Sequence, residues 1–242
     1  QSIKRKEDDK FLTGSGTYND DIDLKNQVYL HLVRSPYAYA KIVKVNYERA
    51  KKCNGILAVL TNNTLKNMNI KPIYPGFKVT NKDGTEMPDT FRNILADKIV
   101  RYVGEPVLAI IGESIEIAEE AADFIETEYE EMQSTTNLKD AIIPEAPTIR
   151  EELSNNICFD WELGKIENVE NALKKSKYIT SIELINNRLV PNPIECRSAI
   201  GQYDQECNTY NLHCSSQGVH GLKKKIISYI QYSRRKTKCF YP

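Results

Sequence analysis

Gln217 has the residue type and the position to bind an oxygen-containing ligand. It lies in the segment SSQGVHG, between an expected strand and the first turn of an expected helix. A glutamine amide can donate a hydrogen bond to an oxo group or an oxyanion, and the exposed N–H groups of a helix N-terminus point the same way. Simple capping of the turn would explain the same residue. Spacing alone favours neither role over the other.

The stretch GSGTYNDDI, residues 14–22, is rich in glycine and aspartate but does not match a ligand loop. A phosphate-binding loop needs a strand before its glycines and a helix after them, and charged segments flank this stretch instead. We therefore predict that Gly14 and Gly16 supply a tight turn. The aspartates lack the further oxygen ligands and the closing glutamate of an EF-hand, so their spacing does not predict a calcium site.

Histidines and cysteines are spaced too widely to predict metal ligands. The chain has three histidines far apart in sequence, and only His220 adjoins the glutamine turn. None of the six cysteines belongs to a C-x-x-C pair, the spacing that zinc and iron–sulfur sites normally use. Cys196 has no identifiable base that would make it a nucleophile. Its neighbours Glu195 and Arg197 are expected to form a structural ion pair.

Composition argues against several classes of protein. The 242 residues include 33 Lys and Arg and 33 Asp and Glu, so the formal net charge of zero gives no reason to expect nucleic acid as a partner. No apolar run approaches the roughly 20 residues of a membrane span. The N-terminal segment QSIKRKEDDK lacks the hydrophobic stretch of a signal peptide. Together with the unclustered thiols, these features predict a cytoplasmic protein.

The first half of the chain alternates strand and helix patterns. Strand patterns occupy residues 27–33, 40–46, 56–61 and 107–111, the last two as continuous apolar runs typical of buried strands. Ser114 can cap a helix with one apolar face, and the segment ETEYEEM can return as a strand, so we expect a βαβ-like unit there. Residues 62–97 are expected to form a long irregular loop.

The second half begins with a polar, proline-bearing stretch, residues 133–156, that is typical of a linker. A helix is expected near residues 169–176. Strands are expected over residues 178–187, 198–204 and 209–215, and a last helix over residues 218–229.

Five sequence blocks occur in the order found in one enzyme family. They are LTGSGTYNDDI (12–22), RSPYAYAKI (34–42), YVGEPVLAIIGES (102–114), NNRLVPNPIECRSAIGQYD (186–204) and SSQGVHGLK (215–223). Together they resemble the large subunit of the xanthine dehydrogenase/aldehyde oxidase family of molybdenum hydroxylases. Within that family, the five blocks most resemble the carbon-monoxide-dehydrogenase-type large chains of bacteria.

The resemblance implies an α+β fold in two parts. Residues 1–135 would form an α/β hammerhead domain, and residues 136–242 the truncated N-terminal part of a molybdopterin-binding domain. The family hydroxylates small substrates with water-derived oxygen at a molybdenum–molybdopterin centre, and carbon monoxide, an aldehyde and an N-heterocycle all remain open as the substrate. Electrons would pass to [2Fe–2S] clusters and FAD on a small iron–sulfur subunit and a medium FAD subunit, in a dimer of heterotrimers.

The same resemblance assigns Gln217, with Gly218 beside it, to cofactor binding, because Gln217 matches the family glutamine that hydrogen-bonds near the molybdenum oxo group. The family's glycine-rich segment and glutamate base would follow KTKCFYP, residues 236–242. We therefore expect no catalytic residue in this fragment, and neither tight cofactor binding nor turnover by it alone. Cys196 departs from the proline usual in the family's EPR block. A non-enzymatic α+β binding or assembly module is the alternative interpretation.

Overall fold

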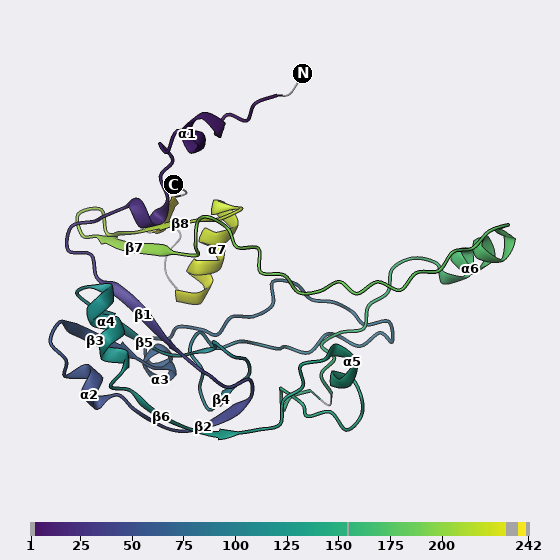
Figure 1. Ribbon diagram of the computed structural model, residues 1–242, viewed down its shortest axis with the longest axis horizontal. Coiled ribbons are helices and arrows are strands. Elements are labelled where there is room, and N and C mark those ends of the chain that lie inside the picture. The colour runs from purple at the N-terminus through teal and green to yellow at the C-terminus, as the bar shows by residue number, and fades with distance from the viewer. Residues whose placement is uncertain (1–2, 154, 231–236, 241–242) are drawn as a thin grey trace. The chain divides into compact units, whose positions relative to one another are not determined.

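The computed structural model describes residues 3–153, 155–230 and 237–240. Helices and small sheets make an α+β chain, as expected (Figure 1). Among the described residues, no helix is both long enough and apolar enough to cross a membrane. The chain forms two compact units. The first comprises Gln1–Ile73, Phe91–Ser134 and Glu195–Pro242, and the second comprises Tyr74–Thr90 and Thr135–Ile194.

The first sheet of the first unit is antiparallel and has β5 at its centre. Its strand order is β1 (Tyr29–Arg34), β5 (Pro106–Gly112) and β3 (Ile56–Leu60). Alternate residues of a strand point to opposite faces. Leu108 and Ile110 pack with α4 (Ile115–Ala122), and Ala109 packs in a separate cluster on the other face. Burial on both faces explains the continuous apolar run of β5.

The second sheet contains the strand that was expected to pair beside β5. Its order is β4 (Ile99–Val100), β2 (Ala40–Asn46) and β6 (Glu126–Glu131), all antiparallel. The predicted βαβ-like unit is therefore wrong, because β5 and β6 lie in different sheets. β1 and β3 already occupy both edges of β5, so β6 pairs with β2 instead. Ala40 and Val100 are fully buried in a cluster with Val107 of β5.

Two expectations for the region after β2 also need correction. β3 is an edge strand, and Leu57 is 55% exposed, so this apolar run is only partly buried. Residues 62–97 are not wholly irregular, because α3 (Asn62–Asn67) begins directly after β3. The N–H of Thr64 donates a hydrogen bond of 3.3 Å to the hydroxyl of Thr61, which caps the helix.

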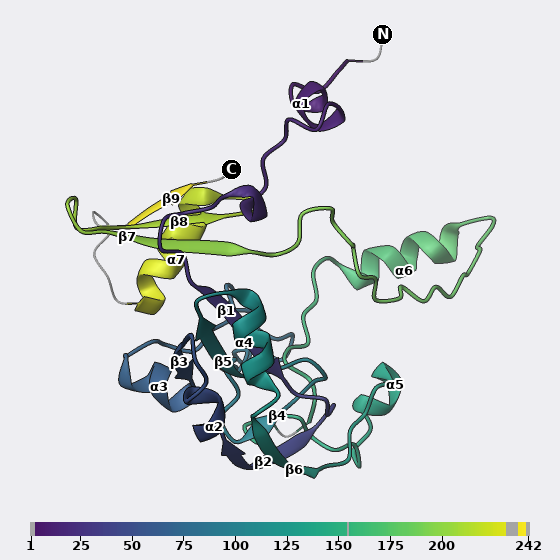
Figure 2. The same cartoon turned by 60° about the vertical axis from the view of Figure 1, so that its left-hand side comes forward.

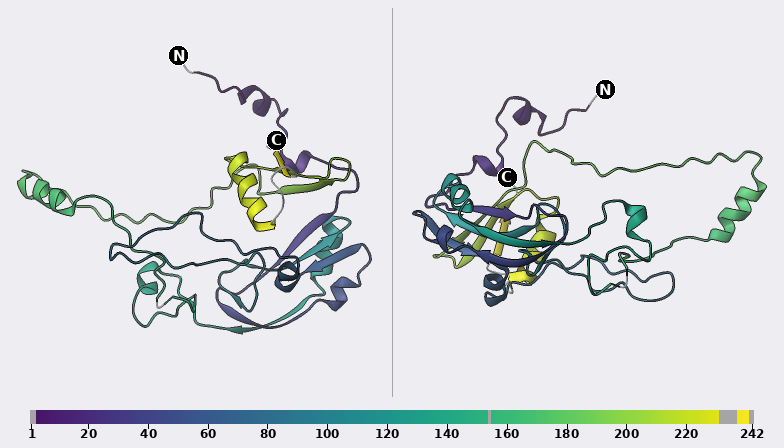
Figure 3. Two further views of the ribbon diagram at one scale, coloured as in Figure 1. Left: turned by 180° about the vertical axis from the view of Figure 1, so that it is seen from behind. Right: turned by 60° about the horizontal axis from the view of Figure 1, so that its bottom comes forward.

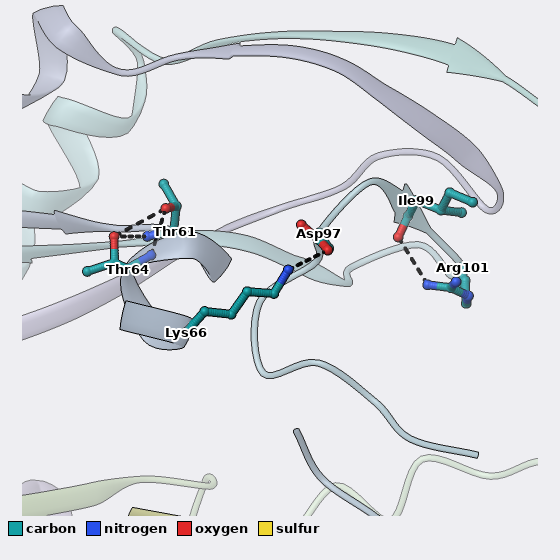
Figure 4. A network of polar contacts seen from close by, with 6 residues as sticks. All are labelled: Thr61, Thr64, Lys66, Asp97, Ile99 and Arg101. Atoms are coloured by element: carbon teal, nitrogen blue, oxygen red, sulfur yellow. Dashed lines mark hydrogen bonds and ion pairs between the residues drawn. The ribbon is translucent and has the colours of Figure 1, made fainter. Parts of the chain in front are cut away.

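An ion pair links α3 to the segment that leads into β4, and a separate hydrogen bond links Arg101 to Ile99 of β4 (Figure 4). Lys66 Nζ lies 2.8 Å from Asp97 Oδ2, and Arg101 Nη1 donates a hydrogen bond of 3.3 Å to the carbonyl oxygen of Ile99. Burial acts to raise the pKa of the Asp97 carboxyl. The side chains of Lys66 and Asn62 outweigh burial, so the pKa lies below its ordinary value.

The third sheet lies at the C-terminal end of the first unit. Its order is β7 (Ala199–Asp204), β8 (Thr209–Cys214) and β9 (Thr237–Phe240). β7 and β8 are antiparallel, whereas β8 and β9 are parallel and are joined through α7 (Val219–Ile230), as Figure 2 shows. The two strands and the helix predicted between residues 198 and 229 are confirmed, and a strand–helix–strand crossover is present here.

Short elements connect the N-terminal part of the first unit. They are α1 (Asp8–Leu12), the 3₁₀ helix η1 (Asn19–Asp21) and α2 (Glu48–Lys51). Gly14 has a φ of 74°, a conformation that favours glycine, so the predicted tight turn is present. A Cβ on Gly16 would stand 2.6 Å from the ring of Phe11. Backbone conformation at Gly14 and the nearby ring of Phe11 at Gly16 therefore explain why glycine occupies both positions, without a bound ligand.

The second unit has less regular structure. Its helices are α5 (Leu138–Ala141), within the expected linker, and α6 (Ile166–Lys175), which confirms the helix expected near residues 169–176. The strand predicted over residues 178–187 is wrong, because this segment runs on after α6 without strand pairing (Figure 3). A strand needs a partner for its N–H and C=O groups, and no described segment pairs with this one.

Candidate functional site

Gln217 lies beyond the carboxyl end of β8, two residues before α7 begins at Val219. His213 of β8 is in register with Phe240 of β9, and the two strands are parallel. The carboxyl ends of both strands therefore reach the same edge of the sheet. Ligands of sheets with parallel strands and crossover helices bind beyond this edge. The Gln217 turn therefore lies at the edge of the sheet where ligands bind in such folds.

Gly218 ends the turn and begins the helix. Its N–H donates a hydrogen bond of 3.1 Å to Ser216 Oγ, and its carbonyl oxygen accepts one of 3.0 Å from the N–H of Leu222. Gly218 is therefore the N-cap residue of α7. No heavy atom lies within 4 Å of the position that a Cβ on Gly218 would occupy. Packing within the described residues does not require glycine here, and the space beside it is open to a ligand.

The side chain of Gln217 is exposed, and no hydrogen bond to another described residue occupies its amide. Ser216 makes the local side-chain contact in this turn, so the turn does not depend on the Gln217 amide. The first N–H groups of the twelve-residue helix α7 carry partial positive charge at the same end. Together these donors can hold an oxygen atom that bears negative charge.

Asn19 holds the start of β7 in place, and the sequence alone did not identify this residue. Its side chain is 1% exposed, and its Nδ2 donates a hydrogen bond of 3.1 Å to the carbonyl oxygen of Ser198. Ala199, the first residue of β7, is in register with Cys214 at the end of β8. Asn19 therefore helps to position the strand end that leads to Gln217. No periodic pattern in the polar stretch around Asn19 signals this long-range contact.

The ion pair expected between Glu195 and Arg197 is not present among the described residues. Glu195 Oε1 instead accepts a hydrogen bond of 3.4 Å from the backbone N–H of Asn19. Cys196, between the two charged residues, is exposed and has a free thiol. Residues 195–197 precede β7 and are not part of the strand. Strand alternation therefore does not bring the side chains of Glu195 and Arg197 to the same face, where they could pair.

The described residues contain no group of three or more His, Cys, Asp or Glu side chains arranged to hold a metal ion. His220 is exposed in the first turn of α7, whereas His31 on β1 lies 3.7 Å from Glu119 on α4. No disulfide bond joins the cysteines whose side chains the structure describes, namely Cys53, Cys158, Cys196, Cys207 and Cys214.

Comparison with known proteins identifies the class to which this architecture belongs. The family model described as the aldehyde oxidase and xanthine dehydrogenase α/β hammerhead domain matches residues 13–133. The model described as the molybdopterin cofactor-binding domain matches residues 149–242, which include the Gln217 turn. The class is thus a hammerhead domain with part of a molybdopterin cofactor-binding domain. The chain belongs to the aldehyde oxidase and xanthine dehydrogenase family, as the five sequence blocks indicate.

Individual relatives agree with this assignment. The chain is 25% identical to the carbon monoxide dehydrogenase large chain of Afipia carboxidovorans over 92% of its own length, and 25% identical to the nicotine 6-hydroxylase large subunit of Paenarthrobacter nicotinovorans over 99%. It spans 28% of the length of each of these relatives. The structure of quinoline 2-oxidoreductase from Pseudomonas putida 86 has the same fold, with a TM-score of 0.82 and 24% identity over 100% of this chain and 30% of that one.

Proposed function

We propose that this chain forms part of the molybdenum-bearing large subunit of an oxidoreductase. The hammerhead domain would cover residues 1–135, and the first part of the molybdopterin-binding domain would cover residues 136–242. The enzyme would hydroxylate a small substrate with water-derived oxygen. The relatives named above act on carbon monoxide and on nicotine, and another is named as a probable aldehyde oxidase. Carbon monoxide, an aldehyde and an N-heterocycle are therefore the candidate substrates.

The observation that carries this proposal is the Gln217 amide, which makes no hydrogen bond to another described residue. It lies at the N-terminus of α7 and at the carboxyl edge of the parallel pair β8 and β9, inside the residues that match a molybdopterin cofactor-binding domain. Ser216 already makes the local turn contact, so the amide is available to a ligand. An oxygen of a bound cofactor is the acceptor that these donors suit.

The residues of this turn fit a molybdenum–molybdopterin group. Gln217 would donate its amide N–H to an oxygen of the group, and Gly218 would allow close approach to the backbone because it has no side chain. When bound, the group supplies the centre that takes two electrons from the substrate. The contribution of this chain would be to bind and orient that group, and no catalytic acid or base is assigned to its residues.

Partner subunits would carry the electrons onward. One relative is named as the gamma subunit of the 6-hydroxypseudooxynicotine dehydrogenase complex, which supports a multi-subunit enzyme. From the family resemblance we place [2Fe–2S] clusters on a small subunit and FAD on a medium subunit, in a dimer of heterotrimers. The cysteines of this sequence lack the clustered spacing of iron–sulfur ligands, which supports placing the clusters on another subunit. The free thiols favour the reducing cytoplasm as the location.

The test is to purify the large subunit that carries these residues together with the subunits that remain bound to it. We expect about one molybdenum per large subunit by elemental mass spectrometry. We also expect reduction of an artificial electron acceptor with carbon monoxide, benzaldehyde or quinoline as substrate. A well-folded subunit that contains no molybdenum and reduces no acceptor would contradict the proposal and favour the non-enzymatic binding or assembly module.

A further inference from the structure

The hairpin formed by β7 and β8 has one closed end and one open end. At the closed end a short turn joins the strands, and the N–H of Cys207 donates a hydrogen bond of 3.0 Å to Asp204 Oδ1 there. At the open end Ala199 is in register with Cys214, and beyond this pair the two strands separate. The chain reaches Gln217 directly after the open end.

Strand β9 supports the open end only in part. The pairing of β8 with β9 extends to His213, which is in register with Phe240. Among the described residues, Cys214 is in register with a residue of β7 alone, Ala199. The ends of a strand pair open more readily than its middle. A contact that fixes the start of β7 therefore also limits the movement of the chain that continues to Gln217.

Asn19 fixes the start of β7 through its side chain and its backbone. Its Nδ2 donates the hydrogen bond of 3.1 Å to the carbonyl oxygen of Ser198, the residue directly before Ala199. Its N–H donates the hydrogen bond of 3.4 Å to Glu195 Oε1. Asn19 is 1% exposed, so water has little access to the side-chain donor, and a hydrogen bond in such a setting is stronger than one in water.

The backbone of Asn19 is itself held in one conformation. Asn19 is the first residue of η1, where the N–H of Tyr18 donates a hydrogen bond of 2.7 Å to Asp21 Oδ2. The N–H of Asp21 donates one of 3.0 Å back to the carbonyl oxygen of Tyr18. The ring of Tyr18 stacks on that of Phe11, with 6.0 Å between the ring centroids. The side-chain amide of Asn19 therefore projects from a fixed support toward the open end of the hairpin.

We propose that Asn19 is a positioning residue for the cofactor site at Gln217. It would act through the strand pair rather than by touching the ligand. With the open end of the hairpin fixed, the turn that carries Gln217 needs less ordering when the ligand binds, and a preordered site holds its ligand more tightly. The identity of the ligand, a molybdenum–molybdopterin group, rests on the proposed function.

Hydrogen–deuterium exchange of the complete large subunit, prepared without cofactor, tests whether Asn19 orders the turn. Asn19→Ala removes the hydrogen bond to the Ser198 carbonyl, so the amides of residues 214–218 should exchange about fivefold faster or more. Slow exchange in β5 shows that the variant folds. Unchanged exchange of residues 214–218 would overturn the proposal.

Two further variants separate the hydrogen bond from packing and from general stability. Asn19→Leu fills much of the space of Asn19 but has no donor, so it should speed the exchange of residues 214–218 as Asn19→Ala does. Protection retained in Asn19→Leu would assign the effect to packing and overturn the proposal. Asp204→Ala removes the acceptor at the closed end of the same hairpin. It should speed exchange near the β7–β8 turn and leave residues 214–218 slow.

Retention of molybdenum tests the step from the turn to the ligand. The complete enzyme is dialysed, and molybdenum per folded subunit is followed over time. We expect Asn19→Ala to lose molybdenum about fivefold faster or more than the unmodified enzyme, and Asp204→Ala to lose it at the unmodified rate. Equal rates of loss in the two variants would overturn the proposal. Unmodified enzyme without any molybdenum would reject the proposed function, and the exchange measurements would still decide the role of Asn19.

Discussion

The side-chain amide of Asn19 donates a hydrogen bond of 3.1 Å to the carbonyl oxygen of Ser198, 179 positions later in the sequence. Asn19 is buried, the contact is partly buried, and Ser198 is the last residue before β7. It joins the residues matched by the hammerhead model to the strand pair that leads to Gln217. One buried amide thus couples the N-terminal part of the chain to the sheet that carries the candidate site.

Replacement of Asn19 should destabilise this junction. Asn19→Ala removes the donor to the Ser198 carbonyl and leaves that acceptor without its partner, so we expect a loss of about 1–3 kcal/mol in the free energy of unfolding. Urea denaturation of the chain measures this change. Asp20→Ala alters the exposed neighbour in the same turn and should change stability by less than about 0.5 kcal/mol. Equal losses in the free energy of unfolding for the two substitutions would contradict a stabilising role for the hydrogen bond between Asn19 and Ser198.

Gly218 should matter for the cofactor more than for the fold. Gly218→Ser places a favourable N-cap residue at the start of α7, so thermal unfolding should be unchanged or slightly raised. The new side chain enters the open space beside Gln217. We therefore expect the molybdenum content of the complete subunit to fall several-fold. Gly201→Ser, on β7 and also without neighbours at the Cβ position, is the control and should retain full molybdenum.

Two glycines with similar backbone conformations allow strain and packing to be separated. Gly55 and Gly104 have φ values of 80° and 87°, but only Gly55 faces a close neighbour, with Ile117 Cδ1 3.0 Å from its Cβ position. Gly104→Ala should cost about 1–2 kcal/mol through backbone strain alone. Gly55→Ala should cost more, because Ile117 must also move. Denaturant unfolding of both variants checks this order, and equal costs would contradict it.

The contact between Lys66 and Asp97 predicts a loss of stability in acid. The pKa of Asp97 is lower in the folded chain than in the unfolded chain, so its contribution is present above the unfolded pKa of about 3.9 and disappears as pH falls through the folded value. Lys66→Met removes an interaction that lowers this pKa. Unfolding free energies measured between pH 2 and pH 6 should therefore fall less steeply in the variant below about pH 4. An unchanged slope would contradict the assignment.

Local patterns predicted the third sheet well. β7, β8 and α7 were expected within one residue of their observed bounds, because alternation and helical periodicity are properties of short segments. The family resemblance and the α+β class likewise followed from ordered local blocks and are confirmed by the two family models. The assignment of Gln217 and Gly218 to cofactor binding stays a prediction.

Relations between distant segments could not be predicted in the same way. The sheet that β6 joins depends on the occupied edges of β5, which no local pattern records. The contact of Asn19 joins positions far apart in a polar stretch without periodicity. Residues 178–187 have the local pattern of a strand, yet pairing depends on a partner that the described residues do not supply.

The most direct test of the account is the turnover per bound molybdenum of the Gln217→Ala variant in the complete enzyme. Loss of a preorganised hydrogen-bond donor to a reacting oxygen reduces turnover by about a hundredfold or more. Gln205→Ala changes an exposed glutamine in the β7–β8 turn and should leave turnover per molybdenum unchanged. We predict that large reduction for Gln217→Ala with the amount of folded enzyme preserved. Unchanged turnover per molybdenum, or a loss of activity fully matched by a loss of folded protein, would contradict a cofactor role for Gln217.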